Sequence, residues 1–366
     1  MTEMNKIDVQ SNILNTMNKE ERQNHILELI EKSDGQQILG TRKIADLFGV
    51  SEMTVRRDLQ ELSQEGLLRR QHGGALSMRH QREVHRPEIG ILLVSKTGKY
   101  TDPFFNAVLE GADSKLQELG YRIAYINTQA EVNTAAHARD LLQSNAVSGI
   151  ILVGPPVGTE SIEYLNVNLR AVLIGTIETL GTDYDAITFD GYNGMRKMVD
   201  HLVQQGYRRL GFITGNYDSR SRGFTDAAKE YNLPVEDDLC VVVPFGLDGW
   251  TPELGHTGAQ QLMQLSNPPD AIVCASDRIA IGAIQWLHHH NFRVPDDIAV
   301  TGFDNITESA FTAPALTTIH VHKQRMGELA AERIVKRIEN AQEIPLLIQT
   351  PTHLVVRASS GGKDET

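Results

Sequence analysis

The chain has 366 residues, of which 40% are hydrophobic and 22% are charged, so it is long enough for two or three globular domains. No stretch approaches 18 uninterrupted apolar residues, and the polar residues 1–19 lack the apolar core of a signal peptide, so we expect a cytoplasmic protein without a membrane partner. The net charge of −12 lies in residues 87–366, which have 22 basic and 34 acidic side chains. Because an acidic body repels DNA, nucleic-acid contacts would be confined to residues 40–82, with eight basic and five acidic side chains.

After the polar tail at 1–19, apolar residues recur at helical spacing in 20–32 and again in 41–48, where Thr41 is the expected N-cap. A third helix is predicted from the N-cap Ser51 to about Glu65. The side chains expected to face inward from the last two helices are Ile44, Ala45, Leu47, Phe48, Val55, Leu59 and Leu62.

Residues 67–78 alternate loosely around a Gly73-Gly74 turn and predict a small β-hairpin. Three helices and a hairpin over 20–76 suit a winged helix-turn-helix domain, the alternative being an ordinary helical bundle with a salt-bridged surface. The exposed face of the third helix would then read DNA, and the hairpin would contact the sugar-phosphate backbone. The candidate DNA-binding residues are Ser51, Met53, Thr54, Arg56, Arg57, Gln60, Arg69, Arg70 and His72.

Three short motifs in this region resemble one family. The runs VSEMTVRRDL at 50–59, EGLLRR at 65–70 and HGGA at 72–75 closely resemble the DNA-binding domain of DeoR-type repressors. The resemblance implies that double-stranded operator DNA is a partner. The segment 35–48 is about two residues longer than is usual in that family, which concerns the turn before the second helix and not the third helix.

Residues 77–87 have no apolar periodicity and are predicted to be a linker. From residue 88, apolar strand-like runs alternate with amphipathic helices, which predicts an α/β fold of parallel sheets flanked by helices. The number of strands favours two lobes with a ligand cleft at the carboxyl ends of the strands. We expect lobe 1 to comprise about 88–190 and 320–336, and lobe 2 about 191–319 and 337–360.

Several short segments of the domain at 88–360 match one family in order along the chain. They are DPFF at 102–105, VSGII at 147–151, GYRR at 206–209, RSRGF at 220–224, SDRIAIG at 276–282, VTGFD at 300–304 and PALTTI at 314–319. With these segments the domain resembles the effector domain of the lactose/galactose repressor (LacI/GalR) family, which is similar to periplasmic sugar-binding proteins. DeoR-type proteins usually continue instead into a sugar-phosphate isomerase-like domain.

The resemblance implies a binding site between the lobes, in which an arginine fork and a carboxylate hold hydroxyl groups and aromatic side chains form the walls. Arg222 is the alternative to Arg220 as the ligand-contacting arginine. Taken singly, the aspartates could equally be helix caps and the aromatic residues core. The candidate effector-binding residues are Phe104, Phe105, Asp190, Arg220, Trp250 and Asp277.

No nucleotide-binding loop, nucleophile elbow or zinc-ligand spacing is present in the sequence, so we expect no enzyme activity, cofactor or metal. The adjacent histidines 288–290 would point in different directions on a helix. Cys240 and Cys274 lie in apolar runs and are expected to be plain buried residues. The sequence thus predicts a homodimeric repressor controlled by a neutral polyhydroxylated effector, a sugar. The alternatives are a solute-binding protein for transport and a sugar-modifying enzyme.

Overall fold

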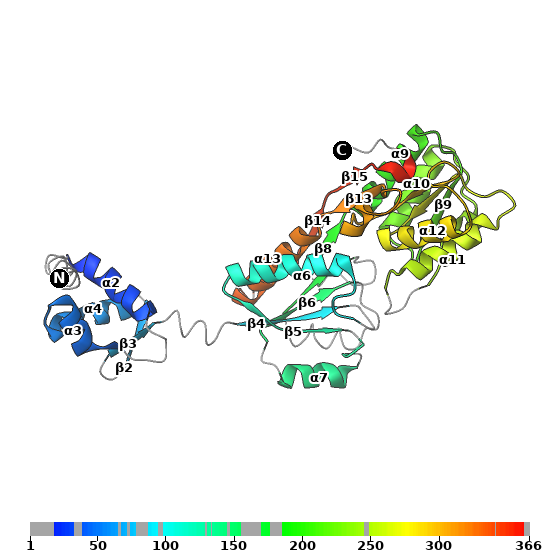
Figure 1. Ribbon diagram of the computed structural model, residues 1–366. Helices are drawn as coiled ribbons and strands as arrows, with labels where there is room; N and C mark the ends of the chain where they lie inside the picture. The colour runs from blue at the N-terminus through cyan, green and yellow to red at the C-terminus, as the bar shows by residue number, and fades with distance from the viewer. Residues whose placement is uncertain are drawn as a thin grey trace, which may run out of the picture. The chain divides into compact units, whose positions relative to one another are not determined.

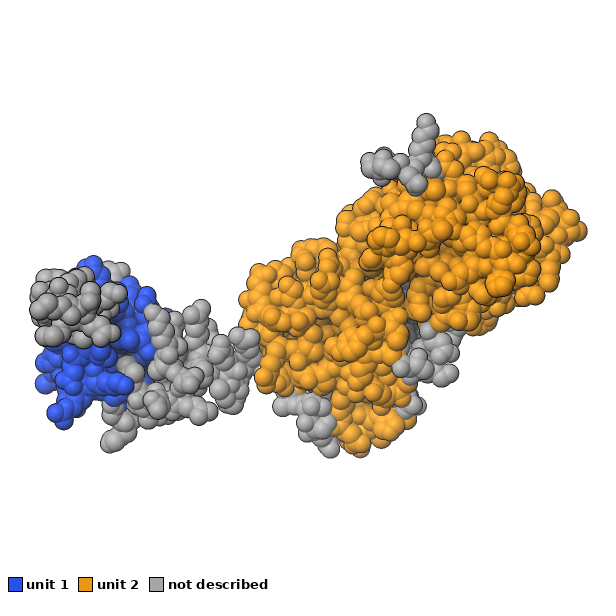
Figure 2. Space-filling view, in the orientation of Figure 1, with its two compact units in different colours: residues 1–86 blue, residues 87–366 orange. Residues whose placement is uncertain are grey.

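The computed structural model describes residues 18–32, 39–64, 67–71, 74–77, 87–93, 98–128, 130–132, 134–144, 147–154, 170–175, 185–244, 249–340 and 342–361. The chain divides into two compact units, residues 1–86 and residues 87–366 (Figures 1 and 2). The predicted tail at 1–19, except for its last two residues, and residues 78–86 of the predicted linker at 77–87 lie outside the described residues.

The first unit combines three helices with a small antiparallel sheet in the order β1-β3-β2. The predicted hairpin is present as β2 and β3, which pair from Leu68↔Ser77 to Gln71↔Gly74. A third strand, β1, was not predicted, and it pairs with β3 through two residues only. The elements are α2 (Lys19–Lys32), β1 (Leu39–Gly40), α3 (Thr41–Phe48), α4 (Glu52–Gln64), β2 (Leu68–Gln71) and β3 (Gly74–Ser77).

The three helices of the first unit share one apolar core. Gly49 takes a left-handed conformation (φ 61°) between α3 and α4, which lets the chain turn sharply there. The Ser51 hydroxyl accepts the Thr54 N–H at 3.1 Å, as expected for an N-cap. Two expectations were wrong: Gly40, not Thr41, is the N-cap of α3, and Leu47 is 46% exposed. The fully buried core side chains are Ile26, Ile30, Ile44, Ala45, Phe48, Val55, Leu59, Leu62, Leu68 and Ala75.

The first lobe of the second unit is a six-stranded parallel sheet in the order β14-β8-β7-β6-β4-β5. Helices α6 and α13 pack against each other on one face, and α7 lies on the other face (Figure 1). Burial of both faces explains why the strands are continuous apolar runs. The elements are β4 (Glu88–Leu93), α6 (Pro103–Glu118), β5 (Arg122–Thr128), α7 (Ala135–Ser144), β6 (Gly149–Val153), β7 (Arg170–Ile174), β8 (Asp185–Phe189), α13 (Lys323–Glu339) and β14 (Leu347–Thr350).

The second lobe is a four-stranded parallel sheet in the order β10-β9-β11-β12, which confirms the predicted α/β class. Two further strands, β13 and β15, pair antiparallel beside it. The elements are α9 (Gly191–Gln204), β9 (Leu210–Thr214), α10 (Ser219–Glu230), η1 (Asp237–Leu239), β10 (Cys240–Val242), α11 (Pro252–Met263), β11 (Ala271–Cys274), α12 (Asp277–His289), β12 (Ala299–Thr301), η2 (Thr307–Ala310), β13 (Thr318–Val321), β15 (Thr352–Val355) and η3 (Ala358–Ser360).

The chain passes between the lobes after β8, between β13 and α13, and between β14 and β15. The last passage corrects an expectation, since residues from 337 onward were assigned to lobe 2. Strand β14 instead adds to the edge of the first sheet, parallel to β8. The fully buried Asp185 explains this, because its carboxylate accepts the Leu346 N–H at 2.9 Å and forms ion pairs with Arg333 and Arg337 of α13. The chain therefore returns to lobe 2 only after Thr350.

Candidate functional site

The exposed face of α4 brings together the side chains predicted to read DNA. Met53 is 78% exposed, Arg56, Arg57 and Gln60 are exposed, and Thr54 is half-buried beside the capping residue. Arg56 lies 3.5 Å from Glu52, one turn earlier on the helix, but both side chains are largely exposed, so this pair holds Arg56 only weakly. The face is therefore available to a groove of DNA.

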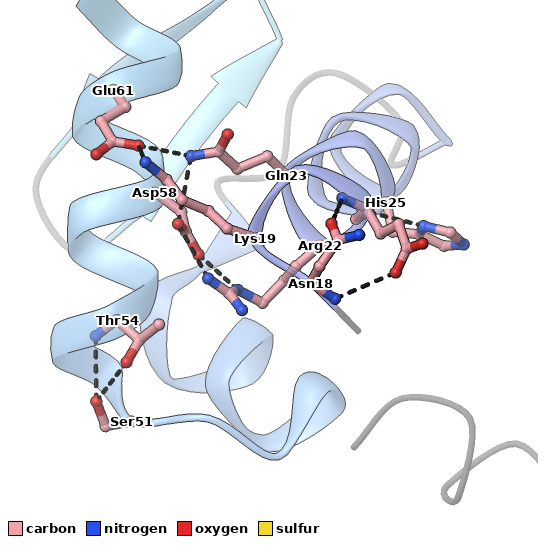
Figure 3. Close-up of polar contacts among 10 residues, drawn as sticks. Asn18, Lys19, Arg22, Gln23, His25, Ser51, Thr54, Asp58 and Glu61 are labelled. Atoms are coloured by element: carbon pink, nitrogen blue, oxygen red, sulfur yellow. Dashed lines mark hydrogen bonds and ion pairs between the residues drawn. The ribbon is translucent and has the colours of Figure 1, made fainter. Parts of the chain in front are cut away.

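A buried ion pair, which was not predicted from the sequence, fixes α4 against α2. The Asp58 side chain is 2% exposed and accepts from Arg22 Nε at 2.7 Å and from Arg22 Nη2 at 3.3 Å (Figure 3). Gln23 of α2 donates to Asp58 at 3.3 Å and to Glu61 at 2.7 Å. An acidic residue beside two arginines suggests a solvated surface, so no local pattern marked Asp58 as buried. These bonds hold the exposed face of α4 in a fixed orientation.

The strand residue Arg70 is exposed on β2, as expected of a side chain that contacts the DNA backbone. His72 and the side chain of Arg69 lie outside the described residues.

We predict that Arg57→Ala weakens operator binding by about 1–3 kcal/mol, because an arginine in the major groove can donate two hydrogen bonds to guanine. Arg70→Ala should weaken binding to all duplexes alike and make the salt dependence shallower, because a phosphate contact releases counterions. Fluorescence anisotropy with operator and scrambled duplexes at several salt concentrations measures both effects. Unchanged binding by both variants would contradict the role of α4 and the hairpin.

A pocket lies between the two lobes of the second unit, with an empty volume of about 770 Å³. The first lobe contributes aromatic side chains that follow β4 and end β8, and the second lobe contributes residues at the carboxyl ends of its strands. This is where ligands bind in open α/β sheets. The lining residues are Asp102, Phe104, Phe105, Gly154, Ile174, Gly175, Phe189, Asn216, Arg220, Gly249, Trp250, Ser276, Arg278, Asp304 and Ile306.

Arg220 is the polar centre of this pocket. Its guanidinium carbon lies 4.5 Å from the centroid of the Trp250 ring, close enough for a cation–π contact. The buried Asp218 pairs with Arg220 at 2.5 Å, and the Ala275 carbonyl accepts from Nη1 at 2.7 Å. Arg222, the alternative arginine, is exposed and does not appear among the described residues that line the pocket. The geometry therefore favours Arg220.

Four of the six predicted effector-binding residues lie together, namely Phe104, Phe105, Arg220 and Trp250. Asp190 does not lie with them among the described lining residues. It is the N-cap of α9, and its carboxylate accepts the Asn193 backbone N–H at 3.0 Å and the Asn193 side-chain amide at 2.7 Å. The capping interpretation that the sequence left open is the one that the structure shows.

Asp277 does not lie with the other four predicted residues in this structure either. Its side chain is fully buried, and both carboxylate oxygens are engaged within the protein: the Thr318 hydroxyl donates at 2.5 Å and the Ile306 N–H at 2.8 Å. Asp277 is absent from the described lining residues. Both donors lie close to the turn that follows β12, so Asp277 supports that turn from inside the lobe.

The acidic residue that this turn presents to the pocket is Asp304. It has a left-handed backbone (φ 109°), and so has Asn305 (φ 52°), an uncommon arrangement for two successive non-glycine residues. The Lys323 ammonium supports the turn by donating to the carbonyls of Asp304 at 2.5 Å and Asn305 at 3.0 Å. Burial raises the pKa of Asp304 well above its usual range, opposed by the charge of Arg220. Its place just beyond a parallel strand was the signal that could have identified it.

We predict that Asp277→Asn removes a pH-dependent destabilisation of the second unit. Burial raises the pKa of Asp277 to about 7, from an ordinary value of 3.8. The folded state therefore binds the proton more tightly than the unfolded chain does, so the stabilisation is complete below about pH 4 and is lost as the pH rises to about 7. The asparagine amide can still accept from Ile306 and donate to Thr318.

Urea unfolding of the wild type and of Asp277→Asn between pH 4 and pH 8 measures the effect. The wild type should lose about 1.4 kcal/mol of unfolding free energy for each unit by which the folded-state pKa exceeds the unfolded-state pKa. Parallel stability curves for the two proteins would contradict the assignment.

Comparisons with known proteins match a domain in each of the two units. Residues 22–81 match the DeoR-like helix-turn-helix domain, and residues 199–360 match the periplasmic binding protein-like domain. The HTH-type transcriptional repressor PurR of Yersinia pestis (strain Pestoides F) is 28% identical over 284 residues, covering 75% of this chain and 80% of PurR. The chain is homologous to PurR/LacI-family transcriptional regulators.

Solved structures of LacI-type regulators share the fold of the second unit. A putative LacI regulator from Bacillus cereus subsp. cytotoxis has a TM-score of 0.69 and 26% identity, covering 76% of this chain and all of that one. The CelR–cellobiose complex has a TM-score of 0.67 and 22% identity over 85% and 91% of the two chains. A LacI-family regulator from Enterococcus faecium with bound ribose has a TM-score of 0.63 and 20% identity over 74% and 98%.

This LacI/PurR homologue thus has a DeoR-like helix-turn-helix domain and an effector-binding domain that fits a ligand-controlled repressor. Its homologues are transcriptional regulators and not enzymes. Within the described residues, no helix is long and apolar enough to cross a membrane. Those residues also contain no group of three or more histidine, cysteine or acidic side chains arranged to hold a metal ion.

Proposed function

We propose that the protein is a cytoplasmic repressor whose operator affinity is controlled by a neutral polyhydroxylated effector, a sugar, bound between the two lobes. The observation that carries the proposal is the balance of charge in the pocket. Arg220 is paired with Asp218, and Arg278 with Asp102 at 3.2 Å, so each cation among the described residues that line the pocket already has a carboxylate partner. A phosphate would require cations whose charge is not already matched.

The remaining groups suit hydroxyls and the C–H face of a sugar ring. Asp304, Ser276 and Asn216 offer acceptors and donors, and Trp250 and Phe104 offer flat apolar surfaces. Two structurally similar regulators have solved structures with cellobiose and with bound ribose, which supports this class of ligand. The match of residues 22–81 to a helix-turn-helix domain favours a regulator over a transport protein, and the described residues that line the pocket include no nucleophile–base pair that would favour an enzyme.

In the proposed mechanism, effector binding changes the angle between the lobes and thereby the spacing of two DNA-binding units in a homodimer.

A candidate dimer surface is the groove between α6 and the edge strand β5. Ile123, Tyr125 and Ile126 are half-buried there, and burial raises the pKa of Tyr125 to about 12. Exposed edge strands invite pairing, so we propose that a second copy of the chain covers this groove. Sedimentation of the wild type and of Ile123→Asp tests the proposal, with a monomeric variant expected.

The proposed effector class is tested by thermal-shift screening of the full chain against neutral sugars, sugar alcohols, sugar phosphates and nucleobases. A ligand present at 100 times its Kd should stabilise the folded state by about 2.7 kcal/mol. We expect shifts with neutral sugars or sugar alcohols only. The compound with the largest shift should then change binding to an operator selected in vitro from random duplexes. Stabilisation by phosphorylated compounds alone, or by nucleobases alone, would contradict the proposed class.

A further inference from the structure

Two charged side chains meet across the mouth of the pocket. Asp102 belongs to the first lobe, where it precedes α6, and Arg278 belongs to α12 of the second lobe. Arg278 Nη1 lies 3.2 Å from Asp102 Oδ2, and the two side chains are 24% and 17% exposed. Both residues line the pocket. They are 176 positions apart in the sequence and belong to different lobes. The contact therefore exists only when the two lobes lie close together.

The carboxylate of Asp102 has two roles, one for each oxygen. Its Oδ1 accepts the N–H groups of Phe104 at 2.8 Å and Phe105 at 3.4 Å and so caps the N-terminus of α6. Its Oδ2 faces Arg278. The same two phenylalanines form the aromatic wall of the pocket. A displacement of Asp102 therefore displaces this wall.

Neighbouring hydrogen bonds also fix the backbone position of Arg278 in the second lobe. It is the second residue of α12, between the anchored Asp277 and Ile279, whose N–H is capped by Ser276 at 3.3 Å. Because Asp277 is fixed to the turn that carries Asp304, Arg278 and Asp304 belong to one rigid part of the second lobe. The pair thus connects the aromatic wall of one lobe to the polar wall of the other.

We propose that Asp102 and Arg278 form an inter-lobe latch, positioning residues that hold the pocket closed and set its aromatic wall against Arg220 and Asp304. The inference rests on the proposed function only in taking this pocket as the effector site. A partly exposed ion pair shifts a two-state equilibrium by about twofold to fivefold, and salt weakens it. The ion pair therefore favours the closed arrangement of the lobes only modestly. An effector can still shift the balance between the open and closed arrangements.

The test uses acrylamide quenching of Trp250 fluorescence in the full chain without effector. The protein has two tryptophans, so Trp286→Phe leaves Trp250 as the only reporter in the pocket. In this background Asp102→Asn keeps the cap of α6, since asparagine caps as well as aspartate, but loses the charge. Arg278→Gln removes the opposite charge. We expect each variant to raise the quenching constant, with no further rise in the double variant.

Salt and a conservative substitution separate a latch from a general loss of structure. Added salt should raise quenching in the parent protein and leave both charge variants unchanged, and Arg278→Lys should retain most of the protection. The matched control is Arg293→Gln, which removes an ion pair to Asp297 within the second lobe and should not alter quenching. Circular dichroism melting confirms that each variant is folded.

Equal quenching in the parent, Asp102→Asn and Arg278→Gln proteins would overturn the latch, as would additive effects in the double variant. Because the measurement contains no effector, its outcome does not depend on which compound binds. A latch that opens as expected, in a protein that no neutral sugar stabilises, would refute the proposed effector class alone.

Discussion

Replacing Asp58 by alanine is expected to destabilise the DNA-binding unit strongly, although Asp58 does not face the proposed DNA-contacting surface. The substitution leaves the guanidinium of Arg22, whose side chain is 13% exposed, without its carboxylate partner. Removing one member of a buried ion pair typically costs about 3–5 kcal/mol. A domain of this size has little more than that to lose, because a small core supplies about 3–5 kcal/mol in total.

Thermal melting of the full chain should therefore show an early transition for Asp58→Ala, with the transition of the second unit unchanged. Operator binding should be lost at temperatures at which the wild type binds. Lys19→Ala is the matched control, since Lys19 pairs with Glu61 between the same two helices but is 58% exposed. Exposed pairs contribute about 0–1 kcal/mol, so this variant should melt close to the wild type. A stable Asp58→Ala protein that binds operator normally would contradict the structural role of the pair.

Arg220→Lys is expected to reduce effector affinity by about tenfold to a hundredfold, equivalent to one charged hydrogen bond of about 1.5–3 kcal/mol. Lysine keeps a positive charge beside the buried Asp218, so the fold is not left with an uncompensated carboxylate. It lacks both the planar fork that reaches two ligand atoms and the flat face that lies 4.5 Å from the Trp250 ring.

Calorimetry with the compound that gives the largest thermal shift measures this loss. Arg222→Lys is the control, two residues away on the exposed side of α10, and it should bind the compound as the wild type does. Operator binding without effector should be the same in both variants. If Arg222→Lys lost affinity and Arg220→Lys did not, the assignment of the ligand-contacting arginine would be reversed.

Local sequence patterns were sufficient to predict most helices and strands and both types of domain. Helical spacing, Ser51 as a cap and glycine at position 49 are local signals, so α3, α4 and their turn could be placed without a structure. Continuous apolar strands indicated parallel sheets buried on both faces, and short motifs at fixed spacing indicated both domain types. Arg220, Trp250 and the phenylalanines Phe104 and Phe105 were implied by the resemblance to the LacI/GalR family, and they do line the pocket.

Which charged groups face the pocket and which lie in the interior depends on long-range packing. Asp277 and Asp304 both follow a parallel strand, and the sequence offered no reason to prefer the second. The Thr318 hydroxyl and Ile306 N–H turn Asp277 inward, and the left-handed turn over Lys323 exposes Asp304 to the cavity. Such choices depend on groups far apart along the chain, whose contacts a local pattern does not record.

Two ion pairs also depend on groups far apart along the chain, namely Arg22 with Asp58 and Arg278 with Asp102. Each joins side chains that look solvated in sequence and that meet only after helices or lobes pack. Strand β14 was likewise placed in the wrong lobe. It pairs with β8 beside the buried Asp185, and these partners precede it by about 160 residues in the sequence. The sequence therefore specifies the local elements and their chemistry, while long-range packing decides which charges are buried and which are left to bind a ligand.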